Sequence, residues 1–219
     1  GDGRLDYLHY VPGGAPDTVF WGNGDRTVVR VDGTYTPIAW RRADQPGRDA
    51  ILWSNPSGAS HLWRTSGTSQ VFSSVRYTTQ QGSTPIVGDY NGDARDDVLF
   101  YRPGSGADVL ALSSGSTYQS RTTTVSGSYR PLAGDVNGDG FEDVVWYGPG
   151  ATADSVWLFG AGGQHRSRPL SVSGDYRPSI GDRDGDGTDD VYWGRPDSSG
   201  FLWSFTPAAE PSYTSTFLP

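Results

Sequence analysis

Residues 135–143 read Asp-Val-Asn-Gly-Asp-Gly-Phe-Glu-Asp, and this nine-residue stretch occurs three times in the chain with small changes. The other copies are residues 89–97, Asp-Tyr-Asn-Gly-Asp-Ala-Arg-Asp-Asp, and residues 182–190, Asp-Arg-Asp-Gly-Asp-Gly-Thr-Asp-Asp. Side chains with oxygen atoms recur at positions 1, 3, 5 and 9, and glycine recurs at position 4. Because Ca²⁺ takes about six to eight oxygen ligands, this density of carboxylates predicts three calcium-binding loops.

An EF-hand is the first alternative, since its loop opens in the same way. An EF-hand requires a bidentate glutamate at position 12 and a helix on each side. Position 12 is instead occupied by Phe100, Trp146 and Trp193. The residues after position 9 form β-branched and aromatic runs that end at proline or glycine, which indicates strands. The sequence therefore excludes an EF-hand.

The spacing of the loops predicts the architecture. Successive loops begin 46 and 47 positions apart, and a period in the forties with several short strands is typical of a propeller blade. One repeat can be divided into four strand segments with glycine or proline at the turns between them. These segments are residues 130–133, 143–148, 154–159 and 165–173. We therefore predict an all-β fold, a β-propeller of four-stranded blades.

Two further repeats are degenerate. Residues 35–39 match 129–133, but the loop that follows, 41–49, keeps only two aspartates, so we expect no calcium there. Residues 1–6 match 138–143 and begin inside a loop, which leaves that site incomplete. The sequence thus predicts five blades in one domain, with a larger propeller, for example seven-bladed, as the alternative. The expected repeat units are residues 1–39, 40–87, 88–133, 134–180 and 181–219.

The loops, with the apolar strand and Gly-Pro pair that follow residue 143, resemble FG-GAP repeats of the VCBS type. The resemblance implies a β-propeller stiffened by about three structural Ca²⁺ ions, as in integrin α-subunit heads and in fungal and bacterial lectins. It also implies side-chain ligands at positions 1, 3, 5 and 9 and a carbonyl ligand at position 7. The implied ligands are Asp89, Asn91, Asp93, Arg95, Asp97, Asp135, Asn137, Asp139, Phe141, Asp143, Asp182, Asp184, Asp186, Thr188 and Asp190.

Composition narrows the setting and the partners. The chain has 219 residues, a net charge of −8, and neither cysteine nor lysine. No basic cluster with interleaved aromatic residues is present, so we expect no nucleic-acid partner. No apolar run is long enough to span a bilayer, so we expect no membrane insertion. Open calcium loops suit the high calcium concentration outside cells, which favours a secreted or cell-surface protein.

Catalysis is not expected. A glycosidase needs two positioned carboxyl groups, yet one of the two glutamates, Glu142, lies in a predicted calcium loop, and Glu210 lies near the C-terminus. The aspartates at positions 17, 108 and 154 recur at strand starts, which is typical of turn chemistry. The three histidines are scattered, and no Gly-x-Ser-x-Gly motif occurs. A five-bladed glycosidase or polysaccharide lyase remains a remote alternative.

Tryptophans are the remaining candidates for a functional role. Repeated tryptophans are expected to fill the layers between blades, but exposed ones would stack on sugar rings and give avidity through repeated sites. We therefore expect non-catalytic recognition, with carbohydrate at a cell surface or in a wall polymer as the favoured target. The alternative is a protein-docking module that targets a secreted bacterial enzyme or toxin. The candidate ligand-binding residues are Trp53, Trp63, Trp146, Trp157, Trp193 and Trp203.

Overall fold

The computed structural model describes residues 5–41, 49–65, 70–113 and 118–219. The chain divides into two compact units, Gly1–Val87 and Gly88–Pro219, and each is described separately. The predictions about the half-loop at residues 1–4 and about the degenerate loop at 42–48 lie outside the described residues. In the described parts, every regular element is a strand except one 3₁₀ turn, Ala161–Gly163.

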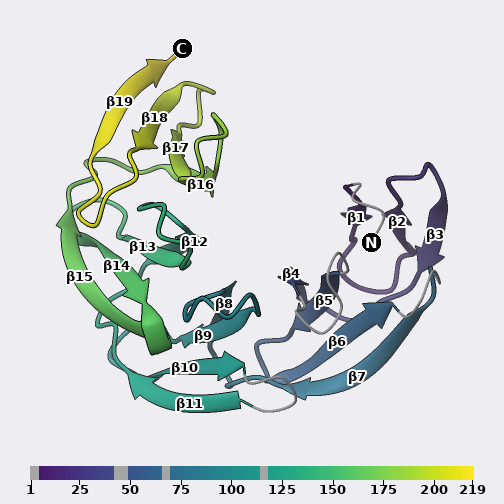
Figure 1. Cartoon of the computed structure of the whole chain (residues 1–219). Coiled ribbons are helices and arrows are strands. Elements are labelled where there is room, and N and C mark those ends of the chain that lie inside the picture. The colour runs from purple at the N-terminus through teal and green to yellow at the C-terminus, as the bar shows by residue number, and fades with distance from the viewer. Residues whose placement is uncertain (1–4, 42–48, 66–69, 114–117) are drawn as a thin grey trace. The chain divides into compact units, whose positions relative to one another are not determined.

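The first unit contains two antiparallel sheets, each of which runs back and forth in chain order (Figure 1). The first sheet has three described strands, and the second has four. The strands of the first sheet are β1 (Tyr7–His9), β2 (Asp17–Phe20) and β3 (Arg26–Val29). Those of the second are β4 (Thr36–Arg41), β5 (Asp49–Ser54), β6 (Ala59–Thr65) and β7 (Phe72–Thr78).

Three more sheets follow, each with four antiparallel strands in chain order (Figure 1). The third sheet is β8 (Thr84–Gly88), β9 (Asp97–Tyr101), β10 (Asp108–Ser113) and β11 (Tyr118–Thr123). The fourth is β12 (Arg130–Gly134), β13 (Asp143–Tyr147), β14 (Asp154–Gly160) and β15 (Gln164–Leu170). The fifth is β16 (Arg177–Gly181), β17 (Asp190–Gly194), β18 (Gly200–Phe205) and β19 (Tyr213–Leu218). The second unit begins at the last residue of β8.

Burial changes from strand to strand within each sheet of the second unit. All five residues of β9 and of β13 are buried, and their sequences are nearly continuous apolar runs. The fourth strands, β11, β15 and β19, are mostly exposed and carry serine, threonine and arginine. A strand that is covered on both faces needs apolar side chains at every position, whereas an outer strand does not. The core therefore follows the second and third strands.

Buried aspartates at the start of β2, β10 and β14 hold the first, third and fourth sheets together. Asp154 Oδ1 accepts a hydrogen bond from Gly148 N at 2.7 Å, and its Oδ2 accepts one from Val172 N at 2.9 Å. Asp17 and Asp108 make the same pair of backbone contacts in their own sheets. The predicted turn role is thus part of a wider one, because each carboxylate also joins the turn before its own strand to the residues that follow the last strand of the sheet.

A tyrosine hydroxyl connects successive sheets in a similar way. The Tyr147 hydroxyl donates to Gly174 O and accepts from Tyr176 N, both at 2.8 Å. Tyr101 makes the equivalent pair of bonds to the segment that leads into β12, and Tyr10 does so ahead of β4. These hydroxyls fix the point at which the chain leaves one sheet and enters the next.

The β-propeller fold class and the five blades predicted from the sequence are confirmed. The repeat period in the forties corresponds to one sheet, and the turns fall at the glycine and proline positions expected. The first sheet differs from the prediction in having three strands among its described residues. That all five blades form one domain stays a prediction.

Candidate metal loops and an interblade cavity

Each predicted calcium loop joins the first strand of a sheet to the second. Residues 89–96 connect β8 to β9, residues 135–142 connect β12 to β13, and residues 182–189 connect β16 to β17. Position 9 is in every case the first residue of the second strand. The loops therefore begin and end on strands whose places are fixed by the sheet, and this brings positions 1 and 9 close together.

The carboxylate at position 1 organises the loop around itself. Asp135 Oδ1 accepts from Gly138 N at 2.7 Å, and its Oδ2 accepts from Gly140 N at 2.8 Å. Asp89 and Asp182 accept from the same two loop positions. Positions 4 and 6 both have positive φ values, a conformation that glycine adopts without strain. Ala94 at position 6 of the first loop is the exception, with φ of 61°.

The third loop brings three carboxylates together. Oxygen atoms of Asp182, Asp184 and Asp186 lie within 4.8 Å of one another, and all three residues are exposed. At position 7, the backbone N–H of Thr188 donates to Asp186 Oδ1 at 2.8 Å, and position 7 does the same in the other two loops. The predicted carbonyl ligands at position 7 stay a prediction.

The aspartate at position 9 is buried and incompletely paired. Asp143 is fully buried, and its Oδ1 accepts from Phe159 N at 2.8 Å. Its Oδ2 and that of Asp190 are buried without a hydrogen-bond partner in the part of the chain that the structure describes. In the first loop, both oxygens of Asp97 accept from backbone N–H groups. An unpaired buried carboxylate oxygen is unfavourable, so a bound cation would stabilise these two positions.

Electrostatics at position 9 lead to the same conclusion. Burial, with a smaller contribution from the charges of Asp139 and Asp135, raises the pKa of Asp143 to about 8. Burial likewise raises the pKa of Asp97 to about 7, with contributions from two carboxylates of its own loop. A bound divalent cation would reverse this effect, because it stabilises the ionised form of every carboxylate around it. The loop residues therefore fit a Ca²⁺ ion.

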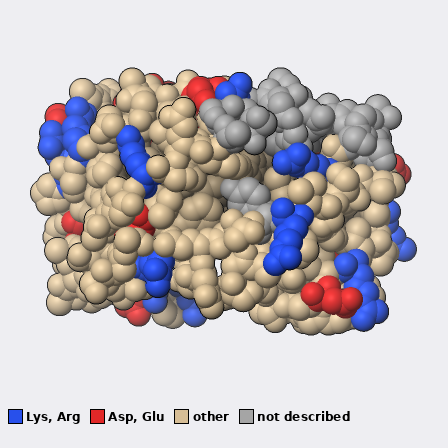
Figure 2. Space-filling view, turned by 90° about the horizontal axis from the view of Figure 1, so that it is seen from below, with Lys and Arg blue, Asp and Glu red and all other residues tan. Residues whose placement is uncertain are grey.

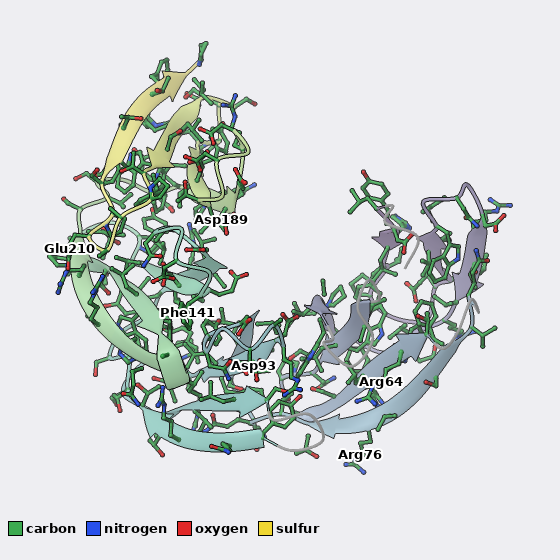
Figure 3. The ribbon with its side chains drawn as sticks, in the orientation of Figure 1. Arg64, Arg76, Asp93, Phe141, Asp189 and Glu210 are labelled. Atoms are coloured by element: carbon green, nitrogen blue, oxygen red, sulfur yellow. The ribbon has the colours of Figure 1, made fainter. Side chains whose placement is uncertain are left out.

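Neighbouring loops in the second unit are joined by position 8, which the sequence analysis did not single out. Asp189 N donates to Asp135 O at 2.7 Å, and Asp135 N donates to Asp189 Oδ2 at 2.8 Å. Between the first and second loops, Glu142 N donates to Asp89 O at 2.9 Å, which is the equivalent of the Asp189 N to Asp135 O bond. Figure 3 labels Asp93, Phe141 and Asp189, one from each of the three loops. Position 8 thus connects one candidate metal loop to the next.

Position 7 adds a second connection between the loops. A Cβ atom built on Gly92 would lie 2.6 Å from the Phe141 ring, and one on Gly138 would lie 3.0 Å from the Thr188 methyl group. Glycine at position 4 therefore leaves room for the side chain at position 7 of the following loop. This contact gives the repeated glycine a packing role as well as a conformational one.

The candidate tryptophans lie mainly between sheets. Trp53, Trp146 and Trp193 are at most 1% exposed, and Trp157 and Trp203 at most 8%. Each of the first three contacts a tyrosine of the preceding sheet and a tryptophan of its own sheet edge to face, with ring centroids 5.0–5.2 Å apart. The sixth candidate, Trp63, is partly buried and packs against Phe72. Trp53, Trp146 and Trp193 thus present no open ring face for stacking on a sugar.

One tryptophan reaches a cavity. A cavity of about 240 Å³ lies between the third and fourth sheets, and Trp157 forms part of its wall. The His165 ring stacks on Trp157 with centroids 3.8 Å apart and an interplanar angle of 14°. The cavity is lined by Leu99, Leu110, Arg121, Thr122, Thr123, Trp157, Phe159, Gln164 and His165. The cavity could not be predicted from the sequence, because its two walls come from different repeats.

The surface charges are dispersed. On the face shown in Figure 2, arginine side chains are spread among uncharged residues and do not form one patch. None of the described helices is long and apolar enough to cross a membrane. The absence of a nucleic-acid partner stays a prediction.

Comparison with known sequences supports the family resemblance. The sequence model of the FG-GAP repeat matches residues 129–166. This segment contains β12, the second candidate metal loop, β13 and β14, and it ends within β15. No curated protein matches the chain. Residues 129–166 are therefore an FG-GAP repeat, and they form most of the fourth blade of a β-propeller.

Proposed function

We propose that this protein is a non-catalytic recognition module that binds Ca²⁺ in its three intact loops and recognises carbohydrate outside the cell. FG-GAP β-propeller repeats are typically binding modules rather than enzymes, and they often bind calcium. The observation that carries the metal proposal is the buried, unpaired Oδ2 atom of Asp143 and of Asp190. Each belongs to a loop that holds three further oxygen-bearing side chains at positions 1, 3 and 5.

Calcium would act here as a structural cation. Positions 1, 3, 5 and 9 of each loop would hold it, and its charge would offset the repulsion among carboxylates that the fold brings together. Without it, burial at position 9 favours the protonated carboxyl group, as the raised pKa values of Asp143 and Asp97 indicate. The loops connect strands of the core, so an ion in each would stiffen the edge of its blade.

Calcium binding is tested by calorimetric titration of the chelated protein and by thermal unfolding. We expect about three ions per chain and a melting temperature that is higher in calcium than in EGTA. No binding heat together with an unchanged melting temperature would overturn the metal proposal. Magnesium serves as a control, because it requires stricter octahedral geometry and keeps more of its water.

The interblade cavity supports carbohydrate as the target. Its wall combines aromatic and aliphatic surface with hydroxyl, amide and imidazole groups, and small-ligand sites typically combine apolar surface with a few polar groups in this way. A glycan array in calcium buffer, repeated after chelation, tests this part. We expect binding that is lost with calcium. Silence on a broad array, with the calcium-dependent melting intact, would replace carbohydrate with a protein partner.

A further inference from the structure

The cavity between the third and fourth sheets has two different walls. Leu99, Leu110 and Arg121 are cross-strand neighbours on β9, β10 and β11, so they form one row on the third sheet. Trp157 and Phe159 on β14 and His165 on β15 form the facing wall. One wall therefore supplies aliphatic surface with a guanidinium group at its outer end, and the other supplies aromatic surface.

Arg121 is the one cationic side chain in a lining that contains no carboxylate. Its Nη1 donates to Gly162 O at 3.3 Å across the gap between the sheets. No acidic side chain in the described ranges lies within ion-pair distance of it. The pKa of His165 is lowered by burial and by the Arg121 charge, so His165 is neutral near pH 7. The cavity thus favours an anionic ligand.

The next gap, between the fourth and fifth sheets, shows how the same position is used there. Arg168 is opposite Val156, just as Arg121 is opposite Leu110, so the two arginines hold equivalent places on β15 and β11. The facing walls are equivalent too. Tyr213 stacks on Trp203 with ring centroids 3.9 Å apart and an interplanar angle of 13°, close to the geometry of the His165–Trp157 pair.

In that second gap the chain provides its own anion. Glu210 accepts from Arg168 Nη2 at 2.5 Å and from Arg168 Nε at 2.6 Å, and this bidentate pairing matches the planar guanidinium fork. Figure 3 shows Glu210 beside β15. The carboxylate comes from the segment between β18 and β19. The corresponding segment before β15 is only the short turn Ala161–Gly163, and it carries no acidic residue.

We propose that the cavity between the third and fourth sheets binds the carboxylate of an acidic pyranose through Arg121, in the place that Glu210 takes against Arg168. This inference rests on the proposed recognition of carbohydrate and specifies its chemical class, a hexuronic acid unit. The sugar ring would lie between the aliphatic row and Trp157, with its hydroxyl groups near Thr122, Gln164 and His165. A volume of about 240 Å³ is below the roughly 300–1,000 Å³ of drug-sized sites, so it suits one sugar ring.

Calorimetry and saturation-transfer NMR in calcium buffer test the inference, with glucuronate and galacturonate as probes and glucose and galactose as neutral counterparts. We expect a uronate to bind at least tenfold more tightly than the neutral sugar of the same configuration. Arg121→Gln should remove this preference, and Arg121→Lys should restore part of it, because lysine keeps the charge but loses the bidentate geometry. Arg76→Gln, an exposed arginine on the outer strand β7, is the matched control and should change nothing.

Four results would overturn the inference. Equal binding of charged and neutral sugars would show that Arg121 does not select an anion. Uronate binding that survives Arg121→Gln, in a variant with unchanged melting temperature, would place the site elsewhere. Binding of a glutamate-rich peptide without uronate binding would assign the cavity to an acidic protein segment. Glycan-array signals from neutral sugars alone would refute this inference and leave the proposed recognition of carbohydrate intact.

Discussion

Replacing Asp143 by asparagine should stabilise the protein strongly without calcium and only slightly with it. Asp143 is fully buried, and burial raises its pKa from 3.8 to about 8. The ordinary pKa of 3.8 lies about three pH units below pH 7, so at pH 7 the unfolded chain is ionised whereas the folded one holds the proton. This difference destabilises the calcium-free fold by about 4 kcal/mol relative to a neutral side chain of the same shape. Asparagine has that shape and keeps an oxygen that can accept from Phe159 N. Asp143→Asn should therefore stabilise the chelated protein by up to this amount.

In calcium, the same substitution should stabilise the protein far less. The ionised carboxylate is then a ligand, and asparagine offers the ion a neutral and weaker one. A hundredfold loss of calcium affinity at a saturating concentration removes about 2.7 kcal/mol of stabilisation. The stabilisation by calcium, and with it the difference between the melting temperatures in calcium and in EGTA, should therefore become smaller in Asp143→Asn by this amount, which leaves a net stabilisation of about 1 kcal/mol in calcium.

Thermal unfolding followed by tryptophan circular dichroism at pH 7 in EGTA and in millimolar calcium measures both effects. For a chain of this size, about 4 kcal/mol corresponds to roughly 8–16 °C. Asp175→Asn is the control, because Asp175 is exposed and, among the described residues, forms an ion pair only with the partly exposed Arg130. It should change stability by no more than about 0.5 kcal/mol in either buffer. A destabilisation by Asp143→Asn that is equal in the two buffers would refute the reasoning.

Three further predictions follow from the loops and from the connections between sheets. Ala94→Gly should stabilise the protein by about 1 kcal/mol in chemical unfolding, because Ala94 has a positive φ, whereas Ala111→Gly in β10 should destabilise it. In EGTA, the free energy of unfolding should fall as pH rises from about 4 to 8. The raised pKa values of Asp97 and Asp143 mean that the folded state binds protons more tightly than the unfolded state. A melting temperature that is independent of pH would contradict this. Tyr147→Phe should destabilise the fold by about 1–3 kcal/mol by calorimetry, because it leaves a backbone N–H and a carbonyl without their hydroxyl partner.

The blades and the loops could be predicted from the sequence because their signals are local and repeated. A glycine at position 4 and carboxylates at alternate positions show the loop directly, and the residues after position 9 show the strand. The role of position 8 could not be predicted in the same way. Asp189 looks like one more acid beside the ligands, and its partner, Asp135, is 54 positions away in the preceding repeat.

Contacts between repeats also account for what the sequence analysis missed at the tryptophans. Periodicity places Trp146 and Trp157 on neighbouring strands, but it does not show which ring another sheet covers. Only Trp157 lines the cavity, and the arginine opposite it comes from the repeat before. The sequence does not distinguish Arg121 as a binding residue, because a single arginine in an outer strand is normally solvated. Its significance appears only when Arg168, at the equivalent place, is seen paired with Glu210.

The contact between Gly92 and Phe141 has a consequence for recombination and design. Each loop is shaped partly by the loop of the following blade, so a blade is not a self-contained module that can be exchanged at its own boundaries. A chimera that transplants the fourth blade alone would bring Phe141 against a new glycine loop and would leave Thr188 without Gly138. The smallest exchangeable segment in this part of the chain runs instead from one metal loop through position 8 of the next.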